Sequence, residues 1–216
     1  MFKDNGLTIV LMLLFGGTLV GHWLTGWAFE NEQLVRHGEA SISAIQYLSH
    51  PQFLATVFEN WESEFLQMSA YVVLTAMLFQ RGSAESADPD TSDRDVDLMK
   101  QARRKGAPDG LRSNSILRGI YAHSLGAALF ILFLASFALH WRFSAAEAAA
   151  DAKTHGEPAI GVLSYLGDAQ FWFESFQNWQ SEFLSTAVLV VLSIFLRERN
   201  SPESKAVGAP HSQTGT

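Results

Sequence analysis

The stretch FENWESEFL at residues 58–66 returns as FQNWQSEFL at residues 176–184, with seven of nine positions identical. The match extends outward from this block. Residues 5–86, shifted by 118 positions without a gap, meet 30 identical residues among 82. Self-similarity at one fixed period indicates that a chain is built from copies of one structural unit. The sequence therefore predicts two halves with the same local structure.

Four apolar stretches lie near residues 7–28, 61–80, 119–141 and 179–196. Each is about 18–23 residues long, which lets a helix cross the ~30 Å hydrocarbon core of a bilayer. The second and fourth reach that length only when the Asn-Trp-x-Ser-Glu block is included. The first is not expected to be a cleaved secretory signal, because the same segment recurs inside the chain. The sequence therefore predicts four transmembrane helices.

Basic residues are distributed unevenly along the chain. Of the 15 Lys and Arg residues, 12 are Lys3 or lie within 81–118 or after residue 196, and the other three lie in the two long loops. Because Lys and Arg favour the cytoplasmic side, both termini and the central linker are predicted to be cytoplasmic. The loops then lie outside, with the six tryptophans at the outer interface, where indole rings prefer to sit.

Each half is predicted to form a helical hairpin, at residues 1–81 and 114–199. Two hairpins that each cross twice share one orientation, so they are expected to be parallel repeats with a pseudo-twofold axis along the membrane normal. The predicted fold is all-α, a four-helix transmembrane bundle. The linker at 82–113 and the tail at 200–216 are charged or polar without apolar periodicity, and both are predicted to be disordered.

The outer loops repeat a short motif, His37-Gly38-Glu39 and His155-Gly156-Glu157. A glycine just past the end of a helix commonly supplies a left-handed stop. A histidine in the last turn also faces the negative end of the helix dipole. The pattern therefore favours two helix stops over metal ligands.

Ionisable residues inside the apolar stretches give the strongest functional signal. His22 and Glu64 lie at matching depths near the outer edge of the hydrocarbon. A carboxylate on a lipid-facing surface at that depth would cost about 2–4 kcal/mol, so we expect these groups to face the bundle interior. The predicted buried polar cluster consists of both copies of this pair and their polar neighbours: His22, Asn60, Ser63, Glu64, His140, Asn178, Ser181 and Glu182.

Three interpretations of this cluster are open. The groups could lock helices together by interhelical hydrogen bonds. They could hold a metal ion or haem, because His and Glu are ligands for zinc, iron and manganese. They could also form a proton or cation path through Glu64 and Glu182. The chain has no cysteine, which excludes thiolate chemistry, and no catalytic residue, specific metal or cofactor is predicted from its motifs.

The residues also resemble a known family. The segments NGLT at residues 5–8, FENWESEFLQM at residues 58–68 and QRGSAES at residues 80–86, together with the His37-Gly38 turn, are similar to an uncharacterised family of bacterial integral membrane proteins. That family is classed as a domain of unknown function. The resemblance implies an inner-membrane location and carries no known activity.

The sequence thus predicts a non-enzymatic structural or accessory component of the bacterial inner membrane. The alternatives are a small transporter or ion-conducting protein and a membrane-bound metal or haem protein. The expected partners are the lipid bilayer and either further copies of the chain or a larger membrane assembly. No nucleic-acid motif is present, so no nucleic-acid partner is expected.

The distribution of Lys and Arg generates a first prediction, about topology. A reporter that is active only outside the cytoplasm should be active when fused after Gly156. A reporter that is active only in the cytoplasm should work when fused within residues 90–105. Measuring both enzyme activities in intact cells checks the arrangement, and the opposite pattern at either position would overturn it.

Overall fold

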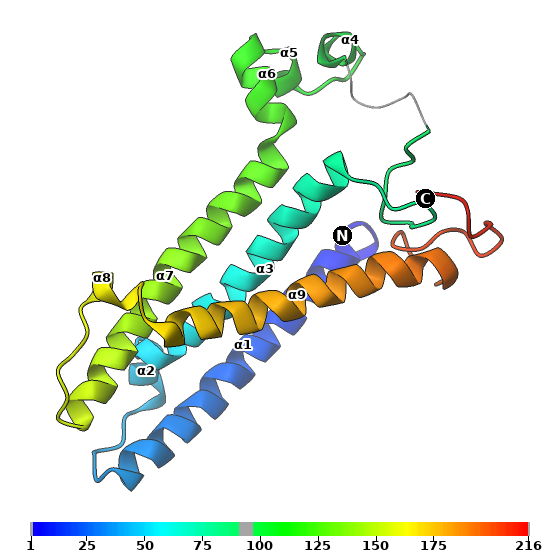
Figure 1. The fold of residues 1–216 in the computed structure, drawn as a ribbon. Helices are drawn as coiled ribbons and strands as arrows, with labels where there is room; N and C mark the ends of the chain where they lie inside the picture. The colour runs from blue at the N-terminus through cyan, green and yellow to red at the C-terminus, as the bar shows by residue number, and fades with distance from the viewer. Residues whose placement is uncertain (1, 91–96, 216) are drawn as a thin grey trace. The chain divides into compact units, whose positions relative to one another are not determined.

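The computed structural model describes residues 2–90 and 97–215, and the residues in this part of the chain form helices and no strand. Four long helices of 35, 27, 31 and 27 residues alternate with short ones. In chain order, which Figure 1 follows from blue to red, the helices are α1 (Phe2–Arg36), α2 (Ala44–Tyr47), α3 (Pro51–Met77), α4 (Leu98–Ala102), α5 (Asp109–Arg112), α6 (Ser115–Ala122), α7 (Ser124–Thr154), α8 (Val162–Tyr165) and α9 (Ala169–Phe195). The all-α class is confirmed.

Two of the long helices, at Asp4–Arg36 and Ser124–Thr154, are apolar and long enough to cross a membrane, judged by length and composition. They correspond to the first and third predicted spans. The other two long helices, α3 and α9, contain the Asn-Trp-x-Ser-Glu blocks and are less apolar. The chain divides into two compact units, which we describe in turn.

Unit 1 comprises Met1–Phe58 and Ala138–Phe171, and in it tryptophan side chains tie the loops to the long helices. The indole N–H of Trp23 on α1 donates to the carbonyl of Ala44, 2.8 Å away. The indole N–H of Trp141 on α7 donates to the carbonyl of Val162, also at 2.8 Å. The two residues are aligned in the repeat, so both halves attach their short loop helix by the same bond.

The same loops contribute buried aromatic rings. Tyr47 and Tyr165 end the short helices α2 and α8, and each is only 2% exposed. Tyr47 packs against Phe53 with ring centroids 5.4 Å apart, and Tyr165 packs against Phe171 at 6.0 Å. Large buried rings contribute about 1.5–3 kcal/mol each through apolar area removed from water. The loops are therefore held by both a polar and an apolar contact.

Unit 2 comprises Glu59–Phe137 and Trp172–Thr216. Aromatic rings of α7 pack on α9 there, with Phe133 at 6.4 Å from Trp179 and Phe137 at 6.2 Å from Trp172. On α7, Gly126 lies against α3, because a Cβ added there would be 3.5 Å from Val73. Valine side chains of α3 therefore pack against the backbone of α7 at this position.

Part of the linker that composition predicts to be disordered is helical. Side chains of Asp97 and Asn114 accept hydrogen bonds from backbone N–H groups at the starts of α4 and α6. Leu111 is buried, and its carbonyl accepts from Nε of Arg118 at 2.9 Å. Local capping and one buried leucine thus accompany the short helices α4 and α5 in a segment without apolar periodicity. Residues 91–96 of the predicted linker lie outside the described residues.

The C-terminal tail, which composition predicts to be disordered, contains one buried cation. Lys205 is 1% exposed, and its ammonium group donates to the carbonyl of Gly82 at 2.5 Å. It also donates to the carbonyls of His211 and Gln213, each at 3.0 Å. A buried charge needs such compensation, and hydrogen bonds from charged groups are about twice as strong as neutral ones. The Lys205 ammonium group therefore links carbonyls of the tail to the carbonyl of Gly82 at the end of the first repeat.

Close packing at Tyr47 generates a second prediction. A Cβ at Gly26 would lie 2.7 Å from the Tyr47 hydroxyl oxygen and 3.1 Å from a ring carbon, whereas one at Gly21 would meet nothing within 4 Å. We expect Gly26→Ala to lower the stability of the detergent-solubilised protein by about 1–3 kcal/mol, because the buried ring must move.

Gly21→Ala is the matched control on the same helix. It should raise stability by up to ~1 kcal/mol, because alanine has the higher helix propensity. Thermal unfolding midpoints of the two variants check both signs. Equal midpoints would show that Tyr47 does not occupy the position described.

Candidate functional site

The two predicted histidines occupy equivalent surroundings in unit 1. His22 is half-buried, with Nε2 3.1 Å from Oγ1 of Thr56 and its ring centroid 5.3 Å from that of Phe53. His140 is fully buried, with its ring centroid 4.9 Å from that of Phe171. Both histidines therefore pack on the phenylalanine that follows the short loop helix. Sequence spacing did not single out these phenylalanines or Thr56.

The predicted cluster residues on α3 and α9 lie in unit 2, and they differ in burial. Ser63 is buried, and its hydroxyl donates to the Asn60 carbonyl at 2.9 Å. Ser181 is exposed and makes the equivalent bond to the Asn178 carbonyl at 2.8 Å. Both serine hydroxyls therefore donate to backbone carbonyls of their own helix. Of the predicted amides, Asn60 is exposed, whereas the side chain of Asn178 reaches across to α3.

Carboxylates that sequence analysis did not select make the contacts between α3 and α9. The side-chain amide of Asn178 donates to the carboxylate of Glu59. The indole N–H of Trp179 donates to the carboxylate of Glu62 at 2.9 Å, and Glu62 is 0% exposed. A third contact joins the amide of Gln67 to the hydroxyl of Thr186 at 2.6 Å. Together they form a ladder of polar contacts along one face of each helix.

The ladder was missed for a clear reason. The repeat highlighted positions that are identical in both copies, but Glu59 and Glu62 are replaced by Gln177 and Gln180 in the second copy. On α3 the ladder therefore uses positions where the copies differ, whereas its partners Asn178 and Trp179 on α9 are identical to Asn60 and Trp61. The Glu-to-Gln differences between the two copies were the sequence signal that pointed to these positions.

The duplicated carboxylates also approach each other. Glu64 is exposed and Glu182 is partly buried, and they are close enough for mutual charge repulsion. This is the one arrangement in unit 2 that brings two of the predicted acidic residues together.

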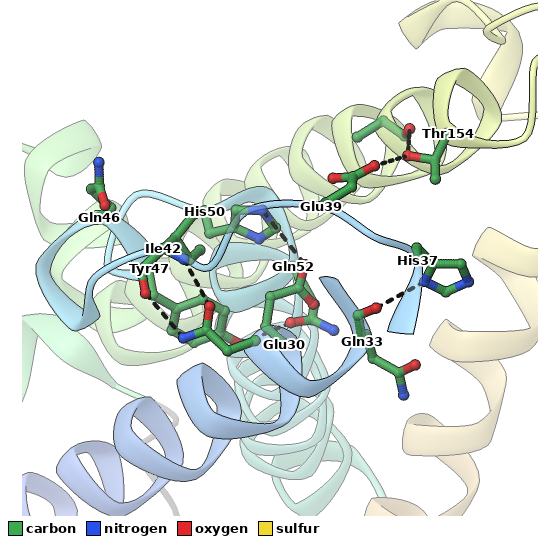
Figure 2. Close-up of polar contacts among 12 residues, drawn as sticks. Glu30, Gln33, His37, Glu39, Ile42, Gln46, Tyr47, His50, Gln52 and Thr154 are labelled. Atoms are coloured by element: carbon green, nitrogen blue, oxygen red, sulfur yellow. Dashed lines mark hydrogen bonds and ion pairs between the residues drawn. The ribbon is translucent and has the colours of Figure 1, made fainter. Parts of the chain in front are cut away.

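A second group of polar contacts lies at the loop end of unit 1 and is shown in Figure 2. Nε2 of His50 lies 3.8 Å from the carboxylate of Glu30, and the Tyr47 hydroxyl donates to the Gln52 side chain at 2.9 Å. Burial raises the pKa of Tyr47 to about 12, and the nearby charges of Glu30 and Glu147 act in the same direction. The tyrosine is thus a fixed donor at neutral pH and holds the loop in place.

The cytoplasm-directed end of unit 2, as the topology predicts it, holds a third group. Glu85 and Glu203 are equivalent positions of the repeat, and their carboxyl groups lie close enough for their charges to interact. The Tyr71 hydroxyl donates to Glu85 at 2.7 Å. Burial raises the pKa of Glu85 above its ordinary value, the contact with Glu203 adds to the rise, and the bond from Tyr71 opposes it.

The comparisons with known proteins identify the family and no activity. The sequence profile of a family described as a domain of unknown function (DUF6766) matches residues 1–216, so the chain belongs to that family. No curated protein matches the chain. No solved structure matches it either.

The acidic pair generates a third prediction. A carboxyl whose pKa is raised in the folded state contributes stability that is present below its ordinary pKa and is lost as pH rises through the raised value. Docking of the tail should therefore be tighter at pH 5 than at pH 8. A nitroxide label at Val207→Cys, the only cysteine in that variant, should be less mobile at the lower pH by electron paramagnetic resonance.

Glu203→Gln removes one member of the pair. It should reduce the pH dependence of the mobility without abolishing it, because burial still raises the pKa of Glu85. It should also favour the docked tail at pH 8 by roughly 1.5- to 5-fold, the range for an exposed charge contact. Glu198→Gln, at an exposed position of the same segment, should leave the pH dependence unchanged. A pH-independent signal from the parent protein would contradict the role of the pair.

Proposed function

We propose that this member of the DUF6766 family is a multi-pass protein of the bacterial inner membrane with a structural or accessory role and no enzymatic activity. In this proposal, α1, α3, α7 and α9 all cross the bilayer, with both termini in the cytoplasm. The two hairpins form a four-helix bundle with pseudo-twofold symmetry. Duplicated sequence and the equivalent Trp23 and Trp141 bonds support the repeat.

The observation that carries the membrane assignment is the apolar surface of α1. Leu7, Leu13 and Leu14 are 75%, 69% and 60% exposed, and the most apolar window of α1 has no buried residue. Exposed apolar surface costs about 25 cal/mol per Å² in water, and a soluble monomer rarely exposes contiguous patches above a few hundred Å². Lipid removes that cost over the whole length of the helix.

The exposed apolar residues of α3 and α9 support the two further spans. They include Val73, Leu74 and Met77 on α3 and Val188, Leu189 and Leu192 on α9. The acidic residues of these helices would be costly in lipid unless they face other helices. The contact of Glu62 with Trp179 meets this requirement for the carboxylate that is fully buried.

A structural role is supported by what the polar ladder does. Its members contact one another across α3 and α9, and interhelical hydrogen bonds contribute about 0.6–2 kcal/mol each between membrane helices. A buried carboxylate in such a ladder specifies which face of each helix meets the other. The ladder thus holds the helices in one register.

The proximity of Glu64 and Glu182 supports a second candidate, a proton or cation path. Two carboxylates at equivalent repeat positions would offer a proton or cation two neighbouring acceptors. Intramembrane carboxylates of this kind commonly mark ion or proton pathways. The structural role depends on Glu62 and the conducting role on Glu64 and Glu182, so separate substitutions distinguish the two candidates.

One set of variants tests both candidates and is the fourth prediction. Glu62→Ala should lower the free energy of unfolding of the detergent-solubilised protein by about 1–3 kcal/mol, because it removes the partner of the Trp179 N–H. The unfolding midpoint should fall accordingly. Glu64→Gln combined with Glu182→Gln should leave the free energy of unfolding within about 0.5 kcal/mol of that of the parent protein. The structural proposal expects no proton flux into liposomes from any form, measured with an enclosed pH dye.

Proton flux from the parent protein that disappears in the Glu64→Gln, Glu182→Gln form would favour the conducting candidate and overturn the structural one. No flux together with an unchanged midpoint for Glu62→Ala would contradict both. The Glu62→Ala protein also serves as the control for flux, because it retains both residues of the path.

A further inference from the structure

The repeated His-Gly-Glu motifs meet at the loop end of unit 1. His37 directly follows α1 and His155 directly follows α7, and both side chains are exposed. Their ring centroids lie 6.0 Å apart, with the ring planes at 75°. The residues are 118 positions apart in the sequence and equivalent in the repeat. Sequence analysis favoured two separate helix stops, and the structure brings the two stops together.

Each histidine precedes a backbone turn of the same type. Gly38 and Gly156 have φ angles of +76° and +71°, in the left-handed region. The N–H of Glu39 donates to the Leu34 carbonyl at 2.8 Å, and the N–H of Glu157 makes the equivalent bond at 2.8 Å. This pairing across six residues is the Schellman arrangement that closes a helix. Neither histidine position depends on a flexible loop.

The ring nitrogens of both histidines have defined roles. Nδ1 of His37 lies 2.9 Å from the Gln33 carbonyl oxygen, and Nδ1 of His155 lies 3.0 Å from the Asp151 carbonyl oxygen. A carbonyl oxygen only accepts, so Nδ1 carries the proton in each neutral ring. The lone pair is then on Nε2. Metal-binding histidines are oriented in this way, with the second ring nitrogen donating to a carbonyl or carboxylate.

We propose that His37 and His155 bind one divalent transition-metal ion, of the zinc or copper class, through their Nε2 atoms. An ion about 2.0–2.1 Å from each Nε2 would keep the two ring centroids roughly 5–6.5 Å apart. The observed 6.0 Å lies within that range.

Carboxylates also lie at these two helix ends. Glu39 lies beside the end of α7, where its Oε1 accepts from the Thr154 hydroxyl at 3.2 Å, as Figure 2 shows. The carboxylate of Asp151 lies 3.4 Å from Nδ1 of His155. Imidazole with carboxylate suits zinc and copper, and the negative charge offsets that of the ion.

The other charged groups of these two helix ends are accounted for. Arg36 is paired with Glu32 on its own helix at 2.5 Å. Lys153 and Glu157 are exposed on the second helix end. The four acidic residues thus outnumber the two basic ones around the histidine pair, which favours a cation over an anion. The four are Glu32, Glu39, Asp151 and Glu157.

The fifth prediction tests this site with Co²⁺ and Zn²⁺ alone, on the full-length protein in detergent. We expect one Co²⁺ per chain with a visible d–d absorption band, displaced by Zn²⁺. His37→Gln and His155→Gln should each weaken binding at least tenfold. His123→Gln, at an exposed histidine of unit 2, should leave the affinity unchanged. Binding should weaken in acid, because the ion needs neutral imidazole.

A replacement that keeps a ligand separates metal binding from a structural effect. His37→Cys, in a chain that has no other cysteine, should retain the Co²⁺ and add a thiolate charge-transfer band in the near ultraviolet. Absence of saturable binding would overturn the proposal. Binding that survives both His37→Gln and His155→Gln would also overturn it, because the ion would then be held elsewhere.

Discussion

The return of the chain at each loop depends on one polar contact, the bond from a helix tryptophan to a loop carbonyl. Trp23 and Trp141 each donate an indole N–H at 2.8 Å to the short helix that follows. An irregular segment beside apolar helices leaves backbone groups that must find partners, because unpaired buried ones are costly. Once the bond is made, the neighbouring Tyr47 and Tyr165 are buried and set where α3 and α9 begin.

The long helices are held by a different balance of forces. Apolar side chains of α1 and α3 face outward, so helix association cannot rest on apolar burial alone. The polar ladder between α3 and α9 adds hydrogen bonds between helices to the apolar contacts. Loss of one partner from a buried contact, such as Glu62 with Trp179, leaves the other with its full desolvation cost.

The contacts made by the polar tail could not be predicted from its composition. Lys205 has few apolar neighbours in sequence, yet its ammonium gathers three carbonyls at 3.0 Å or less. One charge with several acceptors can order a short tail without a hydrophobic core. Disorder was expected because apolar periodicity is absent, and periodicity reports only on segments that fold by burying an apolar face.

The sequence by itself determined the all-helical class, the four long helices and the helix stops at Gly38 and Gly156. These features follow from local chemistry, namely apolar length, helix propensity and the left-handed conformation that glycine adopts without strain. It also located the conspicuous residues His22 and Glu64. It did not reveal which helix faces meet, because a helix that is apolar nearly all round carries little information about its rotation.

Only the tertiary structure decided that Glu59 and Glu62 contact α9 and that His37 lies beside His155. A change of two positions along a helix turns a side chain by about 200°, so Glu62 and Glu64 point to nearly opposite sides. Contacts between residues more than a hundred positions apart depend on how helices pack. Packing is set by the whole set of side chains at an interface, and no local pattern records it.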